Sequence, residues 1–208
     1  MRASAPAALR EADIAVVGAG AAGLYAALCA AREGAGVALV SATPLAQTAS
    51  YWAQGGLAAA LAADDSPELH QRDTEAAGRG LVRRSAAEIL AREAPDCVRD
   101  LQTWGVRFDA DRFGRLALAL EGGHSVRRVV HAGGSATGRR VVRQLSARAV
   151  AEARISILEG ARAHALWQVE GRCVGLLCDG GAIRARRGVV IATGGAADRK
   201  STRLNSSH

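Results

Sequence analysis

The sequence is poor in aromatic residues and nearly devoid of methionine, lysine and asparagine. Aromatic residues make up 3% of the 208 positions and hydrophobic residues 49%, so a core has to be built mainly from small aliphatic side chains. The single lysine, Lys200, and the single asparagine, Asn205, both fall in the last eleven residues, although arginine supplies the basic charge elsewhere. Residues 198–208 resemble the translation of a sequencing-library adapter. We therefore expect a non-native tail on the N-terminal part of a longer protein, cut at about Ala197.

The cysteines lack the spacing of a metal site or a disulfide framework. The chain has four of them, Cys29, Cys97, Cys173 and Cys178. They form no CxxC pair and have no ligand spacing with histidine. This pattern is typical of reduced, mostly buried thiols in a cytosolic protein.

Clustered basic charge is also absent. The formal net charge is +7, but it is dispersed, and no nucleic-acid-binding module accompanies it. Nucleic acid is therefore not an expected partner, whereas dispersed positive charge suits an anionic cofactor and a dicarboxylate substrate. Residues 14–31 are apolar, yet Glu11 and Asp13 precede them and glycines interrupt them, unlike a secretion signal or a membrane span. We expect a cytoplasmic location and no membrane partner.

The hydrophobic pattern predicts an α/β fold, with residues 12–197 forming the N-terminal part of one domain after a disordered start at 1–11. Strand, turn, helix and strand at 13–17, 18–20, 21–32 and 36–41 form a unit with parallel strands. Further helices are predicted at 66–77, 85–104 and 137–153, and further strands at 155–158, 172–179, 182–185 and 188–193. The strands 172–179 and 182–185 are expected to pair as a hairpin, and 188–193 to be a final buried strand.

A glycine-rich turn lies between the first strand and the first helix. Gly18 allows a tight turn, Gly20 lets backbone N–H groups approach a pyrophosphate, and Gly23 allows the helix to pack closely on the strand. The phosphates would then lie at the positive end of the helix. The predicted dinucleotide-binding residues are Gly18, Ala19, Gly20, Ala21, Ala22 and Gly23.

One element of a nicotinamide-cofactor site is missing. An acidic residue at the end of the second strand normally binds a ribose hydroxyl, but Ser41 and Ala42 stand there. The sequence therefore argues against an ordinary NAD site and leaves the choice of dinucleotide to other residues.

Four stretches resemble, in order, the flavoprotein family of succinate dehydrogenase and fumarate reductase, and within it the L-aspartate oxidases. They are SYWAQGG at 50–56, HQRDTEAAG at 70–78, EGGHSVRRVVHAGGSATGRRV at 121–141 and VVIATGG at 189–195. The resemblance covers residues 12–196. It implies a Rossmann-like FAD-binding domain with a parallel sheet, in three layers with inserted helices, truncated before the capping domain that the family carries downstream.

The resemblance also implies how FAD is held. Succinate dehydrogenases and fumarate reductases usually carry a histidine, bonded covalently to FAD, four residues before the alanine that is Ala53 here. Ala49 occupies that position, so the flavin is expected to be bound non-covalently. The implied FAD-binding residues beyond the glycine turn are Ser41, Ala42, Ala49, Ser50, Tyr51, Trp52, Ala53, Gln54, Gly55, Gly56, Thr193, Gly194 and Gly195.

Three residues are candidates for catalysis. By resemblance, Glu121 faces the α-amino group of the substrate, a group that succinate lacks, and a carboxylate opposite an ammonium is a source of selectivity. His124 is interpreted as a donor near the substrate, and Arg127 as a guanidinium suited to a carboxylate. The alternatives are a solvated loop carboxylate for Glu121, a structural histidine for His124, and a surface or subunit-contact role for Arg127.

Neighbouring polar residues are expected to be structural. His131 is expected to support the loop, Arg128 shares the alternatives of its neighbour, and His70 and Asp73 lack the partners that a metal site needs. Leu120 stands where the oxidases often carry arginine, a departure that bears on the local substrate contacts.

The resemblance implies oxidation of L-aspartate to iminoaspartate in de novo NAD biosynthesis, with oxygen or fumarate as acceptor and quinolinate synthase taking the product. Further catalytic arginine and histidine residues of the family lie downstream. We therefore expect the 208 residues alone to be inactive and to bind FAD weakly. The alternatives left open are a succinate- or fumarate-using relative, a flavoenzyme of another substrate class, and a non-catalytic FAD-binding module.

Overall fold

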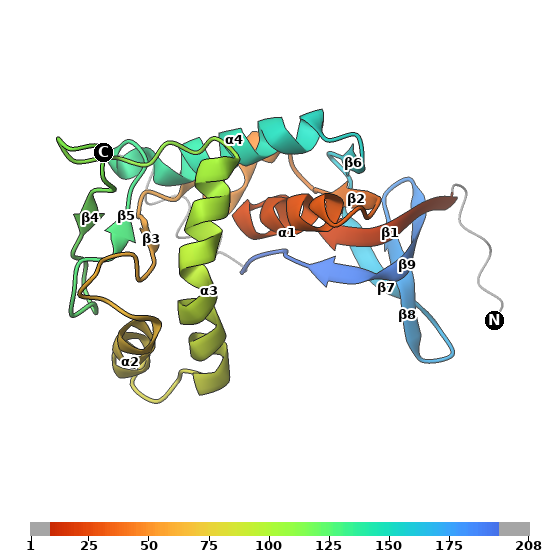
Figure 1. The fold of residues 1–208 in the computed structure, drawn as a ribbon. Helices are drawn as coiled ribbons and strands as arrows, with labels where there is room; N and C mark the ends of the chain where they lie inside the picture. The colour runs from red at the N-terminus through yellow and green to blue at the C-terminus, as the bar shows by residue number, and fades with distance from the viewer. Residues whose placement is uncertain (1–8, 196–208) are drawn as a thin grey trace, which may run out of the picture. The chain divides into compact units, whose positions relative to one another are not determined.

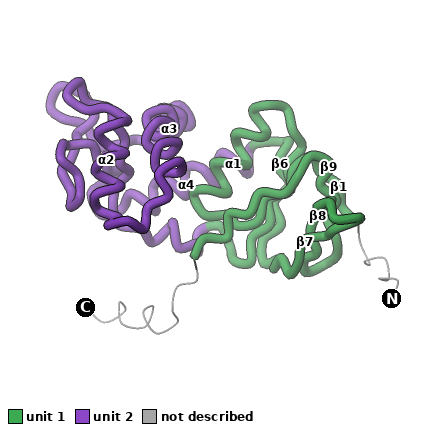
Figure 2. Tube along the Cα trace, turned by 90° about the horizontal axis from the view of Figure 1, so that it is seen from below, with its two compact units in different colours: residues 1–45, 152–208 green, residues 46–151 purple. Residues whose placement is uncertain are grey.

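The computed structural model describes residues 9–195, and the chain divides into two compact units (Figure 2). Unit 1 comprises residues 1–45 and 152–208, and unit 2 comprises residues 46–151. The disordered start predicted for residues 1–8 and the non-native tail predicted for 198–208 lie outside the described residues.

Unit 1 is built on a six-stranded sheet with the order β6-β2-β1-β9-β8-β7 (Figure 1). Its elements are β1 Leu9–Val17, α1 Ala21–Arg32, β2 Val37–Val40, β6 Ile155–Leu158, β7 Ala163–Val169, β8 Arg172–Cys178 and β9 Gly181–Ile191. The strands β6, β2, β1 and β9 are parallel to their neighbours, whereas β7, β8 and β9 form an antiparallel meander. The predicted unit of two parallel strands joined by a helix is therefore confirmed.

Two long strands, β1 and β9, belong to both parts of this sheet. Their C-terminal halves pair at 14–17 with 188–191, beside β2, and their N-terminal halves pair at 9–12 with 182–185, beside β8. The register shifts between the two halves at Asp13. There the Asp13 carboxylate accepts hydrogen bonds from the backbone of Gly36 (2.8 Å) and from Arg186 Nε (3.1 Å). The hydrogen bond from Gly36 and the contact with Arg186 lower the pKa of Asp13.

Unit 1 has three layers. One core cluster joins Ala15 and Val40 of the parallel strands to Leu176 and Ile183 of the meander, so the meander covers one face of the parallel strands. Successive residues of a strand point to opposite faces, so Val16 and Leu39, each 0% exposed, lie on the other face. Helix α1 packs against β1 and β2 and completes the third layer.

Unit 2 combines helices with a small antiparallel sheet in the order β3-β5-β4 (Figure 1). Its elements are the single 3-10 turns Leu45–Gln47 (at the unit boundary), Ala49–Trp52 and Gly134–Ala136, the strands β3 Leu57–Ala58, β4 Leu118–Ala119 and β5 Val129–Val130, and the helices α2 Pro67–Ala77, α3 Arg84–Thr103 and α4 Thr137–Ala151. A core cluster joins Val98 of α3 to Val130 of β5 and Ala59. Helix α2 begins at Ser66, whose side chain accepts a hydrogen bond from Leu69 N (3.1 Å).

Three sequence expectations need correction. Residues 9–11 belong to β1 and not to a disordered start, because they pair with 182–184 of β9. The separate strands predicted at 182–185 and 188–193 are one continuous strand, β9. Its end is not buried, since Ile191 is 63% exposed. The strand β7 was not predicted, because its half-exposed residues show no buried run.

None of the four cysteines, all of which lie within residues 9–195, forms a disulfide, but the prediction that most are buried is wrong. Cys178 is buried, and burial raises the pKa of its thiol, whereas Cys173 is exposed. Within residues 9–195, no helix has the length and hydropathy that crossing a membrane requires.

Candidate functional site

The glycine turn between β1 and α1 has the geometry of an anion-binding turn. Gly18 has φ +102°, and a Cβ there would lie 2.3 Å from the carbonyl oxygen of Ala192. Gly20 is the N-cap of α1 and provides no capping side chain, and the first turn of the helix contains no acidic residue. The start of this helix therefore has no capping side chain and no acidic residue in its first turn to compete with a phosphate.

The segment after β9 lies beside the same turn. Ala192 N donates to the carbonyl of Val17 (2.8 Å), and Gly18 N donates to the carbonyl of Val40 (2.8 Å). The backbone of Thr193 also borders Gly18. Ala192 thus contacts the glycine turn through its backbone. The predicted cofactor residues of the returning strand come directly after it in the sequence: Thr193, Gly194 and Gly195.

Ser41 and Ala42 follow β2 as predicted. The Ser41 hydroxyl, however, makes its hydrogen bond within the turn that follows β2. Ser41 is 3% exposed, and its hydroxyl donates to the carbonyl of Thr43 (2.6 Å). Its backbone carbonyl accepts a hydrogen bond from Ala161 (2.9 Å). No acidic side chain takes the place of the ribose-binding residue of an NAD site at this strand end.

In unit 2, the N-terminus of α4 holds the loop 49–56 in place. This loop carries the predicted cofactor residues Ala49, Ser50, Tyr51, Trp52, Ala53, Gln54, Gly55 and Gly56. Gly138 N donates to the carbonyl of Ala53 (3.0 Å). A Cβ on Gly138 would lie 2.1 Å from the carbonyl oxygen of Ser50, so only glycine allows this approach. The Trp52 ring is 69% exposed and packs edge-on against Tyr51. The loop is thus fixed through its backbone, and its large side chain remains available for contact.

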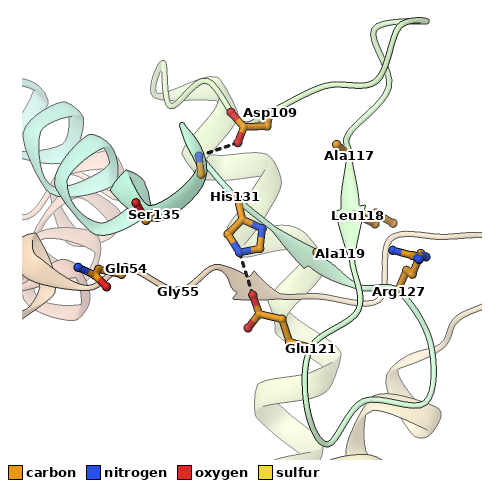
Figure 3. A pocket seen from close by; sticks show the side chains of 11 residues that line it. Gln54, Gly55, Asp109, Ala117, Leu118, Ala119, Glu121, Arg127, His131 and Ser135 are labelled. Atoms are coloured by element: carbon orange, nitrogen blue, oxygen red, sulfur yellow. Dashed lines mark hydrogen bonds and ion pairs between the residues drawn. The ribbon is translucent and has the colours of Figure 1, made fainter.

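Two of the three candidate catalytic residues, Glu121 and Arg127, line one cavity of about 610 Å³ together with Gln54 and Gly55 of that loop (Figure 3). Glu121 Oε1 lies 2.8 Å from His131 Nε2, and the two side chains are 46% and 21% exposed. Glu121 is therefore more than a solvated loop carboxylate. Arg127 forms no ion pair with any residue in the described range 9–195, which leaves its guanidinium free for an anionic ligand.

Asp109 supports the far wall of the cavity (Figure 3). Its carboxylate accepts hydrogen bonds from Gly133 N (2.7 Å) and Gly134 N (3.0 Å). These hydrogen bonds lower the pKa of Asp109. Its backbone N–H donates to the carbonyl of His131 (2.7 Å), so Asp109 holds the chain at that histidine and directly after it.

Arg128 is buried and forms an ion-pair cluster that the sequence did not predict. Its side chain is 0% exposed, and it binds Asp65 through Nε (2.9 Å) and the guanidinium nitrogen Nη2 (2.8 Å) and Asp73 through Nη1 (2.6 Å). Asp73 also accepts hydrogen bonds from the backbone and the hydroxyl of Ser125 (both 2.8 Å). A substrate contact and a surface or subunit-contact role were both open for Arg128, and burial of the side chain contradicts the surface role. One local signal was present, because Arg128 lies two residues before the buried Val130 and so on the same strand face.

His124 belongs to this cluster and does not line the cavity of Glu121 and Arg127. Its Nδ1 lies 3.1 Å from Arg128 Nη1. An arginine only donates, so Nδ1 accepts and the neutral ring carries its proton on Nε2. His70, 2% exposed, packs edge-on against the His124 ring. Burial, with Arg128 and His124 nearby, lowers the pKa of His70. Among the described residues 9–195, no group of three or more ligand side chains is placed to bind a metal.

Comparison with known proteins agrees with the geometry of each unit. The family profile for the FAD binding domain matches residues 13–207. The chain is 47% identical to an L-aspartate oxidase of Nostoc sp. over 88% of its length and 46% identical to one of Caulobacter vibrioides over 86%, but it covers only 32% and 36% of those proteins. The chain thus spans about a third of the length of the curated relatives it matches.

Solved structures also have this fold. The apo Sdh1 complex of Mycobacterium smegmatis matches with a TM-score of 0.84 and 32% identity, covering 90% of this chain and 35% of the matched one. E. coli quinol fumarate reductase matches with a TM-score of 0.84 and 30% identity, covering 90% and 33%. These matches confirm the predicted α/β, Rossmann-like fold. The match over residues 13–207 shows that this chain belongs to the FAD binding domain family, and its cofactor is FAD.

Proposed function

We propose that the complete protein containing this chain oxidises L-aspartate to iminoaspartate. The observation that carries the proposal is the cavity of unit 2, which is lined by the carboxylate Glu121 and the unpaired guanidinium Arg127. An amino dicarboxylate offers an ammonium to the first and a carboxylate to the second, both as charge-assisted hydrogen bonds. The relatives with the highest identities quoted above are named L-aspartate oxidases, which supports the same substrate.

The residues of this chain contribute binding and orientation. FAD, when bound, supplies the two-electron acceptor for the oxidation of the substrate Cα–N bond. Arg127 neutralises a substrate carboxylate, and Glu121 places the ammonium and thereby the Cα–H. Positioning of this kind lowers the barrier because the orientation is established before reaction. The proposed donor role of His124, through Nε2–H, rests on the resemblance alone, because this side chain does not line the cavity.

The proposed FAD-binding residues of unit 1 are the glycine turn 18–23 and residues 41–42 and 193–195. Those of unit 2 are the loop 49–56. Binding is proposed to be non-covalent, because Ala49 offers no nucleophile at the position where relatives carry the bonded histidine. Acid precipitation of the complete protein should then release all of its flavin into the supernatant.

The wider setting is part of the same proposal. The electron acceptor is oxygen or fumarate, the pathway is NAD biosynthesis, and the product passes to quinolinate synthase in the cytoplasm. The support for this setting is the name of the relatives, L-aspartate oxidase, and the absence of disulfide spacing in the sequence.

Anaerobic flavin reduction by aspartate and by succinate tests the substrate. The complete protein should be reduced by aspartate and much more slowly by succinate. Glu121→Gln removes the charge opposite the ammonium and should lower kcat/KM for aspartate about 10- to 100-fold. Fumarate-driven reoxidation of the reduced flavin should change less than about threefold, because fumarate has no ammonium.

Other results would favour the alternative functions named in the sequence analysis. A protein that prefers succinate, and whose Glu121→Gln variant turns over dicarboxylates normally, is a succinate- or fumarate-using relative. A protein reduced by neither acid is a flavoenzyme of another substrate class or a binding module. The 208 residues alone should show no aspartate-dependent reduction.

A further inference from the structure

Through its contact with Glu121, His131 is a second residue of the cavity that affects how the substrate ammonium is bound. We propose that His131 is a specificity-determining positioning residue: through Nε2 it holds the Glu121 carboxylate in the orientation that selects an amino dicarboxylate over a plain dicarboxylate. This inference rests on the proposed function and deepens it.

His131 is itself rigidly placed. It follows β5, the central strand of the small sheet, whose Val129 and Val130 are buried. Its carbonyl accepts the backbone hydrogen bond of Asp109, and the Asp109 carboxylate accepts hydrogen bonds from the N–H groups of Gly133 and Gly134, two and three residues further along the chain. The backbone that carries the ring is therefore held in place, and Nε2 lies on the cavity wall (Figure 3).

Glu121, by contrast, lies on a loop two residues beyond the short strand β4, and its side chain is 46% exposed. A glutamate in such a place samples several rotamers, and fixing them costs about 1–2 kcal/mol of side-chain entropy. Its hydrogen bond to His131 is the one side-chain contact that holds this carboxylate among the residues described. His131 binds Oε1, which leaves Oε2 to accept a hydrogen bond from a substrate ammonium.

This division of the two oxygens predicts selectivity. His131 Nε2–H donates one hydrogen bond to Glu121 Oε1, so the carboxylate reaches the ammonium already oriented. Succinate and fumarate have no ammonium and gain nothing from that orientation. Loss of the His131 contact should therefore weaken aspartate binding while leaving the handling of plain dicarboxylates unchanged.

Two variants of the complete protein, His131→Gln and His131→Asn, test whether a donor at the position of Nε2 is needed. Both replace the ring by a polar amide, but the amide lies at different distances from the backbone. In His131→Gln the amide nitrogen reaches roughly the place of Nε2, whereas in His131→Asn it stops near the place of Nδ1. We expect KM for aspartate to rise about tenfold in His131→Asn and less than about threefold in His131→Gln, with kcat nearly unchanged in both. Fumarate-driven flavin reoxidation should match wild type in both variants.

A double-mutant cycle tests whether His131 acts through Glu121. In the Glu121→Gln background, His131→Asn should raise KM for aspartate by less than about twofold further, because the carboxylate that it positions is gone. A residue that merely stabilised the fold would give the same factor in both backgrounds. Bound flavin and the thermal midpoint are measured for each variant, so that a loss of fold is distinguished from a loss of contact.

A matched control is available in unit 1. His164 of β7 also pairs with an exposed carboxylate, that of Asp179, and both side chains are 53% exposed. His164→Asn should leave KM for aspartate at the wild-type value. It removes a similar surface pair that has no place in the cavity.

The outcomes separate this inference from the proposed function. If wild type oxidises aspartate but His131→Asn has the wild-type KM, or if the two substitutions act independently, the inference is overturned and the proposed function stands. If His131→Gln is as impaired as His131→Asn, the role assigned to Nε2 is overturned. A wild-type protein that aspartate does not reduce overturns both proposals.

Discussion

The two units place their candidate site residues by different physical means. In unit 1 the glycine turn 18–23 is shaped by backbone contacts, with Gly18 against the carbonyl of Ala192 and the open N–H groups at the start of α1. In unit 2 the cavity depends on side-chain pairs, Glu121 with His131 and Arg128 with two aspartates. Backbone-built sites tolerate only glycine at a few positions, whereas side-chain-built sites depend on charges being paired.

The largest expected effect tests the backbone-built site. Gly18→Ala in the complete protein combines a left-handed φ with a Cβ at 2.3 Å from the Ala192 oxygen. It should lower the free energy of unfolding by on the order of 4 kcal/mol or more and abolish most FAD binding. Denaturant unfolding and the flavin content after desalting measure the two effects.

Gly34 provides the control for that substitution. Its φ is +83°, yet no atom lies within 4 Å of its would-be Cβ. Gly34→Ala should cost about 1–2 kcal/mol from backbone strain alone and leave the flavin content unchanged. Equal destabilisation by the two substitutions would show that crowding against Ala192 does not shape the turn.

The next effect tests the side-chain-built site. Arg128→Met leaves the Asp65 and Asp73 carboxylates, 0% and 14% exposed, without their cation. Removing one partner of a buried ion pair costs about 3–5 kcal/mol, and Arg128→Lys should cost less because it keeps the charge. Denaturant unfolding of both variants measures this difference.

The matched control is the exposed pair of Arg92 and Glu88 on α3, with side chains 67% and 47% exposed. Arg92→Met should change the free energy of unfolding by less than about 0.5 kcal/mol. If Arg128→Met behaved like Arg92→Met, unit 2 would not depend on charge pairing.

The smallest effect concerns pH. The pKa of Asp109 is lowered from 3.8 by the N–H groups of Gly134 and Gly133, so the ionised form stabilises the fold. That contribution is fully present above the unfolded value near 3.8 and is lost as the pH falls through the lower folded value. Asp109→Asn should cost about 1 kcal/mol at neutral pH, and this cost should shrink below pH 3.8. Thermal midpoints of wild type and variant across the acid range measure it; a cost that does not depend on pH contradicts the assignment.

The sequence predicted the strand–turn–helix unit around the glycine turn well because its signals are local. Helix α1 begins and ends at the predicted residues 21 and 32, and β6 at 155 and 158. The glycine spacing and the strand–turn–helix order carry their physical meaning within a dozen residues. The parallel sheet followed from the same pattern.

The side-chain-built site was predicted only in part. Glu121 and Arg127 came from the resemblance, and the structure places both on one cavity. The roles of His131 and Arg128 were missed, because they depend on partners 10 and 55–63 residues away in the sequence. No periodicity links residues at such spacings, so only the folded chain reveals the pairs.

The pairing of β1 with β9 also determines when unit 1 is able to form during synthesis. Unit 2 is one continuous segment, complete once residue 151 has left the ribosome, whereas β1 at 9–17 pairs with 182–191. Until then β1 has one of its two sheet neighbours, β2, and an unpaired edge open to wrong partners. Because contacts distant in sequence form slowly and domains fold as units, we expect unit 2 to fold first and the six-stranded sheet to close last. The glycine turn, the earliest-made part of the cofactor site, is thus among the last to acquire its final shape.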